Sequence, residues 1–145
     1  MLHVITSTLD PLCSIIQDDP VRPEIPIEFR VSDTANIFVL LDDYSKPMAA
    51  VCVAYKDSVP ATVLELAEPN SLTATVAVFY TIWSYRSGAG RELIQAVQQW
   101  LHSNNPLLNK FVTLSPPTDM ARVFHLRNGA NVLSVNQDTV NYIYN

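Results

Sequence analysis

Six consecutive residues, Tyr85-Arg86-Ser87-Gly88-Ala89-Gly90, have the types and spacing of an anion-binding loop. The chain has only three glycines, and two of them lie in this loop. The loop precedes a helical pattern, and the free backbone N–H groups of a helix N-terminus attract an anion. Glycines leave those groups open to a phosphate, and Arg86 and Arg91 can add charge-assisted contacts. We therefore expect a pyrophosphate to bind here.

The spacing excludes two common nucleotide-binding motifs. The dinucleotide fingerprint G-x-G-x-x-G is absent because position 93 is Leu, and the lysine of a triphosphate-binding loop is absent too. A Gly-x-Gly pair alone also fits a tight turn that allows close helix packing. The elements on either side of the loop favour the anion site over this alternative.

A buried strand and an amphipathic helix flank the loop. Residues 75–83 are apolar on both faces, as in a strand in the middle of a covered sheet. After the loop, apolar residues recur at helical spacing at Leu93, Ile94, Val97, Trp100 and Leu101. A buried strand that delivers the chain to a helix N-terminus positions the loop for binding.

Further strands and helices surround this unit. The pattern predicts strands at 3–6, 37–41, 48–55, 111–114, 132–135 and 139–144. It predicts helices that begin at Asp10-Pro11, within 60–68 and at 119–128, the last ended by Gly129. Residues 18–26 hold three prolines and should be irregular, either as part of a substrate wall or as a plain connector. This order predicts one domain over 1–145 with a mixed α/β sheet.

Composition limits the function. The formal net charge of -5 and scattered basic residues argue against a nucleic-acid binder. No apolar run approaches the ~20 residues of a membrane span, and Met1–Asp10 does not resemble a signal peptide. Cys13 and Cys52 lack metal-type spacing and suit a reducing, cytoplasmic compartment, and no metal site is expected from the isolated His3 and His102.

The loop resembles the pyrophosphate loop of the GNAT acyltransferase superfamily, Gln/Arg-x-x-Gly-x-Gly/Ala. Both glycines match, whereas Tyr85 replaces the leading Gln/Arg, with Arg86 adjacent. A second GNAT pattern, Asn-x-x-Ala-x-x-x-Tyr-x-x-x-Gly-Phe, is similar to the stretch from Thr118 to Ala130. There Ala121 and Gly129 match, and His125 stands in place of Tyr. The resemblance extends from about residue 37 to the end, and the pattern is also similar to small GNAT-like proteins of bacteriophages.

The resemblance implies a mostly antiparallel sheet with helices on both faces and acetyl-CoA, or another acyl-CoA, as cofactor. Phe79, Tyr80 and Thr81 would pair with the pantetheine amides, and the strands would splay beside Tyr80 to hold the thioester. The pyrophosphate would bind the loop. The cofactor residues would be Phe79, Tyr80, Thr81, Tyr85, Arg86, Ser87, Gly88, Ala89, Gly90 and Arg91. The reaction would be direct acyl transfer to a small-molecule or protein amine, by a monomer or homodimer without nucleic acid or membrane.

The candidate catalytic residues are His125 and Tyr80. His125 occupies the place of the family's acid and could donate a proton near neutral pH; alternatively it lies at the edge of an apolar helix face. Tyr80 could orient a water or the substrate, or only pack in a wall. Residues 73–83 contain no carboxylate base, which leaves Glu65 and Glu68 acting through water. These departures keep open an alternative function as a non-catalytic GNAT-like binding or structural module.

Overall fold

The computed structural model describes all residues 1–145, and its centre is one seven-stranded sheet in the order β1-β2-β3-β4-β5-β7-β6. The strands are β1 (Leu2–Ile5), β2 (Ala35–Leu41), β3 (Pro47–Lys56), β4 (Val76–Ser84), β5 (Lys110–Thr113), β6 (Asn131–Val135) and β7 (Val140–Tyr144). Only β4 and β5 pair in parallel, and all other neighbours are antiparallel. The expected mixed, mostly antiparallel α/β sheet is confirmed.

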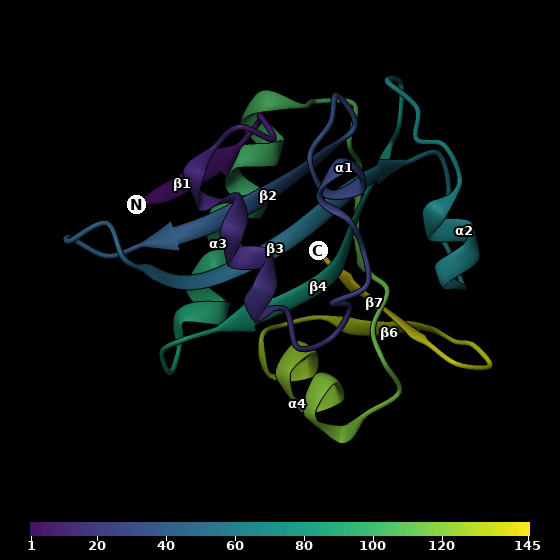
Figure 1. The fold of residues 1–145 in the computed structure, drawn as a ribbon. Coiled ribbons are helices and arrows are strands. Elements are labelled where there is room, and N and C mark those ends of the chain that lie inside the picture. Colours follow the sequence, from purple (N-terminus) through teal and green to yellow (C-terminus); the bar gives the residue numbers. More distant parts are fainter.

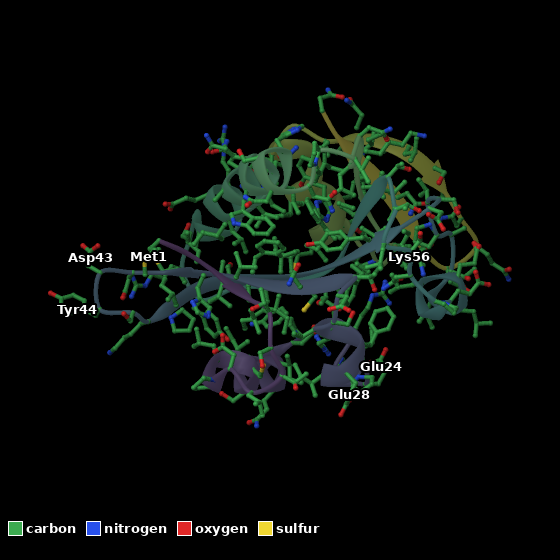
Figure 2. The ribbon with its side chains drawn as sticks, turned by 90° about the horizontal axis from the view of Figure 1, so that it is seen from above. Met1, Glu24, Glu28, Asp43, Tyr44 and Lys56 are labelled. Atoms are coloured by element: carbon green, nitrogen blue, oxygen red, sulfur yellow. The ribbon has the colours of Figure 1, made fainter.

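Helices lie on both faces of the sheet (Figure 1). They are the 3-10 helix η1 (Pro11–Asp18) and the α-helices α1 (Ile27–Arg30), α2 (Val63–Ala67), α3 (Ala89–Asn104) and α4 (Asp119–Arg127). In Figure 1, η1 and α1 lie in front of the sheet and α3 lies behind it, and Figure 2 shows the same elements on opposite sides after a 90° turn. None of these helices has the length and apolar character that crossing a bilayer requires.

Each face of the sheet has its own apolar layer. The layer under α3 contains Leu93, Ile94 and Val97, with Phe124 of α4 packed at its border. The layer under η1 and α1 contains Ile15, together with alternate residues of the central strands. β4 contributes to both layers, which explains why its sequence is apolar on both faces.

Two local expectations differ from the structure. The helix opened by Asp10-Pro11 is a 3-10 helix, since its bonds run from residue i+3 to i, as from Cys13 N–H to the Asp10 carbonyl. Asp10 caps it as expected, accepting from the Leu12 N–H at 2.9 Å. Residues 19–26 are irregular as predicted, whereas Asp18 is the last residue of η1. The four-residue α1 directly after them gave no periodic signal, because one turn is too short to show one.

Candidate functional site

A pocket of about 360 Å³ opens where β4 and β5 separate. The two strands pair only from Val76 with Lys110 to Phe79 with Thr113. Beyond that point β4 remains paired with β3 only, whereas the chain after β5 turns to β7, where Ser115 bridges Val140. The splay expected beside Tyr80 is therefore present, and it forms the pocket.

The pocket is bounded by β4, the segment after β5, the start of α3, α4 and the irregular segment before α1. Its lining residues are Pro20, Val21, Phe79, Tyr80, Thr81, Ile82, Trp83, Ser84, Gly90, Leu114, Ser115, Pro116, Thr118, Met120, Ala121, Phe124 and His125. Because Pro20 and Val21 are among them, the proline-rich segment is a wall of the pocket and not a plain connector.

A bulge in β4 lies at the mouth of the splay. Cys52 faces Thr81 and Val53 faces Phe79, so Tyr80 is an extra residue without a partner on β3. From Tyr80 to Ser84 the edge of β4 that faces β5 has no neighbouring strand, and these residues all line the pocket. An extended ligand could pair with this free edge as an added strand does.

The glycine-rich loop adjoins the pocket, since Ser84 directly before it and Gly90 at its end are lining residues. Gly88 is the N-cap of α3, with a φ of 81° and no side-chain cap. The backbone N–H groups of Ser87, Gly88, Gly90 and Arg91 donate to no group of the chain. Free donors at the positive end of a 16-residue helix are the arrangement that attracts an anion, and anion binding at this loop stays a prediction.

Gly90 is required by packing, not by its backbone angles. A Cβ built at this position would lie 2.9 Å from Cε1 of Phe124. The ring of Phe124 therefore rests directly on the first turn of α3, and this contact joins α4 to the loop. The alternative interpretation, close helix packing, is confirmed for Gly90.

The side chains around the loop form more hydrogen bonds and ion pairs within the chain than the sequence suggests. Arg86 forms an ion pair with Asp42 from the β2–β3 turn, although half of its side chain is exposed. Tyr85 donates to the Asp18 carboxylate at 2.6 Å and accepts from Nε1 of Trp83 at 3.0 Å. Tyr85 therefore fastens the loop to η1, whereas Arg91 is exposed and forms no ion pair.

His125 lines the pocket and is only 4% exposed, and it is the one residue of α4 that is buried, so it does not lie at the edge of the helix's inward face. Its Nδ1 lies 2.7 Å from the Tyr144 hydroxyl, and its ring stacks on Tyr142 with centroids 5.0 Å apart. Burial lowers the pKa of His125 to about 4. The imidazole is therefore neutral at pH 7, and the expected imidazolium acid is unavailable there. Its Nε2 makes no hydrogen bond within the chain and is not sealed from solvent.

Tyr80 does not present its hydroxyl to the pocket. The hydroxyl is fully buried without a hydrogen-bond partner, and the ring packs edge-on against Phe29 with centroids 5.6 Å apart. Burial raises the pKa of Tyr80 well above its ordinary value. The expected role in orienting water or substrate through this hydroxyl is wrong, and Tyr80 contributes wall and backbone to the pocket.

No Asp, Glu, Lys or Arg lines the pocket. Glu65, considered as a base through water, lies on α2, where its Oε1 accepts from the Ala61 N–H at 3.0 Å. Glu68 caps the C-terminal end of α2 and is exposed. Neither carboxylate belongs to the pocket, so the expectation that they act there is wrong.

A buried polar cluster of Asp19, Arg22 and Arg30 lies beside the pocket, and sequence reasoning missed it. Nε and Nη2 of Arg22 donate to the carbonyls of Tyr80 and Leu114, each at 2.9 Å, and so bridge the two separating strands. Nη1 of Arg30 donates to Asp19 at 2.7 Å, and both side chains of this pair are fully buried. The only available signal was two arginines and an aspartate in a proline-rich segment, which equally fits a solvated loop.

The chain matches no protein-family model and no curated protein. Solved structures do match. A malonyl-CoA decarboxylase from Agrobacterium vitis has a TM-score of 0.70 and 29% identity over 86% of this chain and 35% of that chain. GphF, a GNAT-like decarboxylase in complex with isobutyryl-CoA, has a TM-score of 0.75 and 16% identity over 99% of this chain and 98% of that chain. The chain has the GNAT fold.

A probable acetyltransferase from Staphylococcus epidermidis shares this GNAT fold, with a TM-score of 0.65 and 15% identity over 99% of this chain and 98% of that chain. The resemblance seen in the sequence is thus confirmed at the level of the fold. The chain spans 35% to 60% of the length of three malonyl-CoA decarboxylases of known structure.

Proposed function

We propose that the protein binds an acyl-CoA, with the pyrophosphate at residues 86–91 and the thioester in the pocket between β4 and β5. The observation that carries the proposal is that the unpaired edge of β4 leads directly to the loop with backbone N–H groups that have no partner. The unpaired edge of β4 leads from the pocket to a helix N-terminus with four unused N–H donors. A long ligand with an anionic end and an amide-containing arm suits both.

The pocket favours a reaction that needs no general base. Acylation of an amine requires a group that takes the ammonium proton, and no carboxylate lines the pocket. We therefore infer that the reaction is decarboxylation of a β-carboxyacyl-CoA such as malonyl-CoA. The bond between the α-carbon and the carboxylate breaks, and CO₂ leaves. The electron pair passes into the thioester as an enolate, and the α-carbon then takes a proton from water.

His125 is suited to stabilise the enolate oxygen as a neutral donor. Burial raises the pKa of Tyr144, which keeps its hydroxyl protonated and able to donate to Nδ1 of His125. In that arrangement the ring proton sits on Nε2, which has no other partner in the chain. A donor aimed at developing negative charge in a largely apolar pocket typically contributes ~10²–10³-fold to the rate.

Transfer of the acyl group to an amine is the second candidate. The fold match to an acetyltransferase of similar length favours it, together with the sequence resemblance. This reaction would require the amine to arrive deprotonated or to lose its proton to water. Its acceptor would be a small molecule or a protein.

Binding is tested first, by thermal unfolding with CoA. A ligand at 100 times its dissociation constant adds about 2.7 kcal/mol to the free energy of unfolding. Ala121→Trp should fill the pocket and remove the response to acyl-CoA. Val123→Trp on the same helix should keep it, because Val123 is half exposed and outside the pocket. If millimolar CoA and acyl-CoA produce no stabilisation of the wild-type protein, the proposed function is wrong.

Chemistry is tested by chromatography of the CoA species after incubation with malonyl-CoA. Acetyl-CoA without free CoA is the expected product, and His125→Phe should slow its formation at least ~10²-fold. Free thiol released only when an amine panel is present would instead establish the second candidate. Binding without any turnover would support a non-catalytic module.

A further inference from the structure

The buried cluster under the separating strands carries more positive than negative charge. Asp19 is its single carboxylate, and it is saturated by contacts from Arg30, from Thr81 Oγ1 at 2.7 Å and from the N–H groups of Val21 and Arg22. Asp19 pairs with the guanidinium of Arg30, so the guanidinium of Arg22 has no carboxylate of its own. Carbonyl oxygens alone accept its hydrogen bonds.

No surface carboxylate forms an ion pair with Arg22. Glu24 is the nearest acidic residue in sequence, and its carboxylate attracts Arg22 electrostatically. Glu24 is nevertheless exposed and forms no ion pair with Arg22. In Figure 2, Glu24 and Glu28 lie on the outer side of the α1 segment, away from the sheet.

Arg22 lies one hydrogen bond behind the pocket wall. The two carbonyls that it holds belong to Tyr80 and Leu114, both lining residues, and its chain neighbours Pro20 and Val21 line the pocket as well. Nη1 makes no hydrogen bond within the chain and is not sealed from solvent. Burying a guanidinium without a carboxylate is costly, and an anion bound nearby offsets that cost.

We propose that Arg22 is a specificity-determining residue that makes the pocket prefer acyl-CoA molecules with a carboxylate on the acyl group. The proposal rests on the acyl-CoA function proposed above. The positive charge lies in a poorly solvated region, where its attraction for a carboxylate is screened less than at a surface. Neutral acyl chains gain nothing from it, so substrate and decarboxylated product differ in affinity.

The test compares two thioethers by isothermal titration calorimetry. S-(2-carboxyethyl)-CoA has the chain length and carboxylate of malonyl-CoA but lacks the thioester carbonyl, so it cannot decarboxylate. S-propyl-CoA replaces the carboxylate by a methyl group. We expect the wild-type protein to bind the carboxylated ligand about tenfold more tightly, a difference of about 1.4 kcal/mol.

Arg22→Met should reduce this preference to about twofold or less, with most of the change in the affinity for the carboxylated ligand, a difference of under about 0.5 kcal/mol. Arg22→Lys should retain at least half of the preference on a logarithmic scale, because it keeps the charge. Arg127→Met removes an exposed arginine at the end of α4 and should change neither affinity. Circular dichroism checks that each variant is folded.

The outcomes separate this proposal from the binding function. Equal wild-type affinities for the two thioethers would overturn the role of Arg22 while leaving acyl-CoA binding intact. If Arg22→Met lowers the affinities for both thioethers by the same factor, Arg22 only supports the strands. If the wild-type protein binds neither thioether, acyl-CoA binding is refuted, and the specificity proposal with it. If Arg22→Met does not fold, the ratio of the affinities for the two thioethers, measured for the wild type and for Arg22→Lys, still tests the specificity proposal.

Discussion

His125 should make the stability of the protein depend on pH. Its pKa of about 4 in the folded state lies below the ~6.5 of an unfolded histidine. Between these values the unfolded chain binds a proton that the native state does not, so stability falls as the pH is lowered through this range. By pH 5 the loss should amount to about 2 kcal/mol relative to neutral pH.

Urea unfolding at pH 7, 6 and 5 measures this effect. His125→Gln removes the titrating group while keeping a polar side chain, so the gap in stability between wild type and variant should narrow by about 2 kcal/mol from pH 7 to pH 5. His102→Gln is the matched control, because His102 is exposed, and its curve should follow the wild type. Parallel pH profiles for wild type and His125→Gln would contradict the burial of the imidazole.

At the scale of single residues, the sequence located His125 but not its environment. Its spacing from Ala121 and Gly129 places it on α4 in the GNAT pattern. Its burial comes from Tyr142 and Tyr144 on β7, which no local pattern near His125 could reveal. A side chain's pKa is set by contacts from distant segments, so residue types predict a role more readily than a protonation state.

At the scale of elements, the two glycines of the loop should respond differently to substitution. Gly88 has a positive φ with open space around it, so Gly88→Ala should cost ~1–2 kcal/mol of stability through backbone strain and leave the pocket unchanged. Gly90→Ala pushes against the ring of Phe124, a pocket residue, at 2.9 Å. Overpacking of this kind costs ~1–3 kcal/mol, and here it should also displace the pocket wall.

Chemical denaturation and calorimetry with CoA and acyl-CoA distinguish the two effects. We expect Gly90→Ala to weaken the binding of acyl-CoA more than the binding of CoA, because the pocket wall next to Phe124 is disturbed. Gly88→Ala should change the affinities for both ligands by the same factor. The opposite pattern would mean that the pocket does not hold the acyl group.

The regular elements were predictable because each carries its own periodic signal. The apolar run of β4 and the helical spacing of α3 are both visible in the sequence, and β4 lies within one residue of the expected strand boundaries. Which strands pair with each other was harder to predict from the sequence. The separation of β4 from β5 depends on Ser115 bonding to Val140, and on Arg22 reaching across from a segment more than 50 residues away. Only the resemblance to a known family suggested the splay.

At the scale of the whole molecule, the N-terminal segment is part of the site and not an appendage. Its irregular stretch closes one side of the pocket, and the cluster of Asp19, Arg22 and Arg30 fastens it to β4 and to the chain after β5. Arg30 of this cluster also contacts Cys52, which belongs to the apolar layer under η1 and α1. Stability of that layer and shape of the pocket are therefore coupled through a few polar side chains.

Asp19→Ala should test this coupling. Burial would raise the pKa of Asp19, but hydrogen bonds from the Arg22 N–H, from Arg30 and from Thr81 outweigh it, so the native state holds a carboxylate. Removing it leaves Arg30 buried without its partner, which typically costs ~3–5 kcal/mol, a large part of the ~5–15 kcal/mol that stabilises a domain. Asp10→Ala is the matched control, because it removes a helix cap and a partly exposed contact with His3 and should cost only ~1 kcal/mol. Urea denaturation followed by Trp fluorescence measures both stability changes, since Trp83 lies in the affected layer.

Because Pro20 and Val21 are held through Asp19, the Asp19→Ala variant should also lose acyl-CoA affinity at temperatures where it remains folded. A stability change no larger than that of Asp10→Ala would mean that the N-terminal segment is held by apolar packing alone.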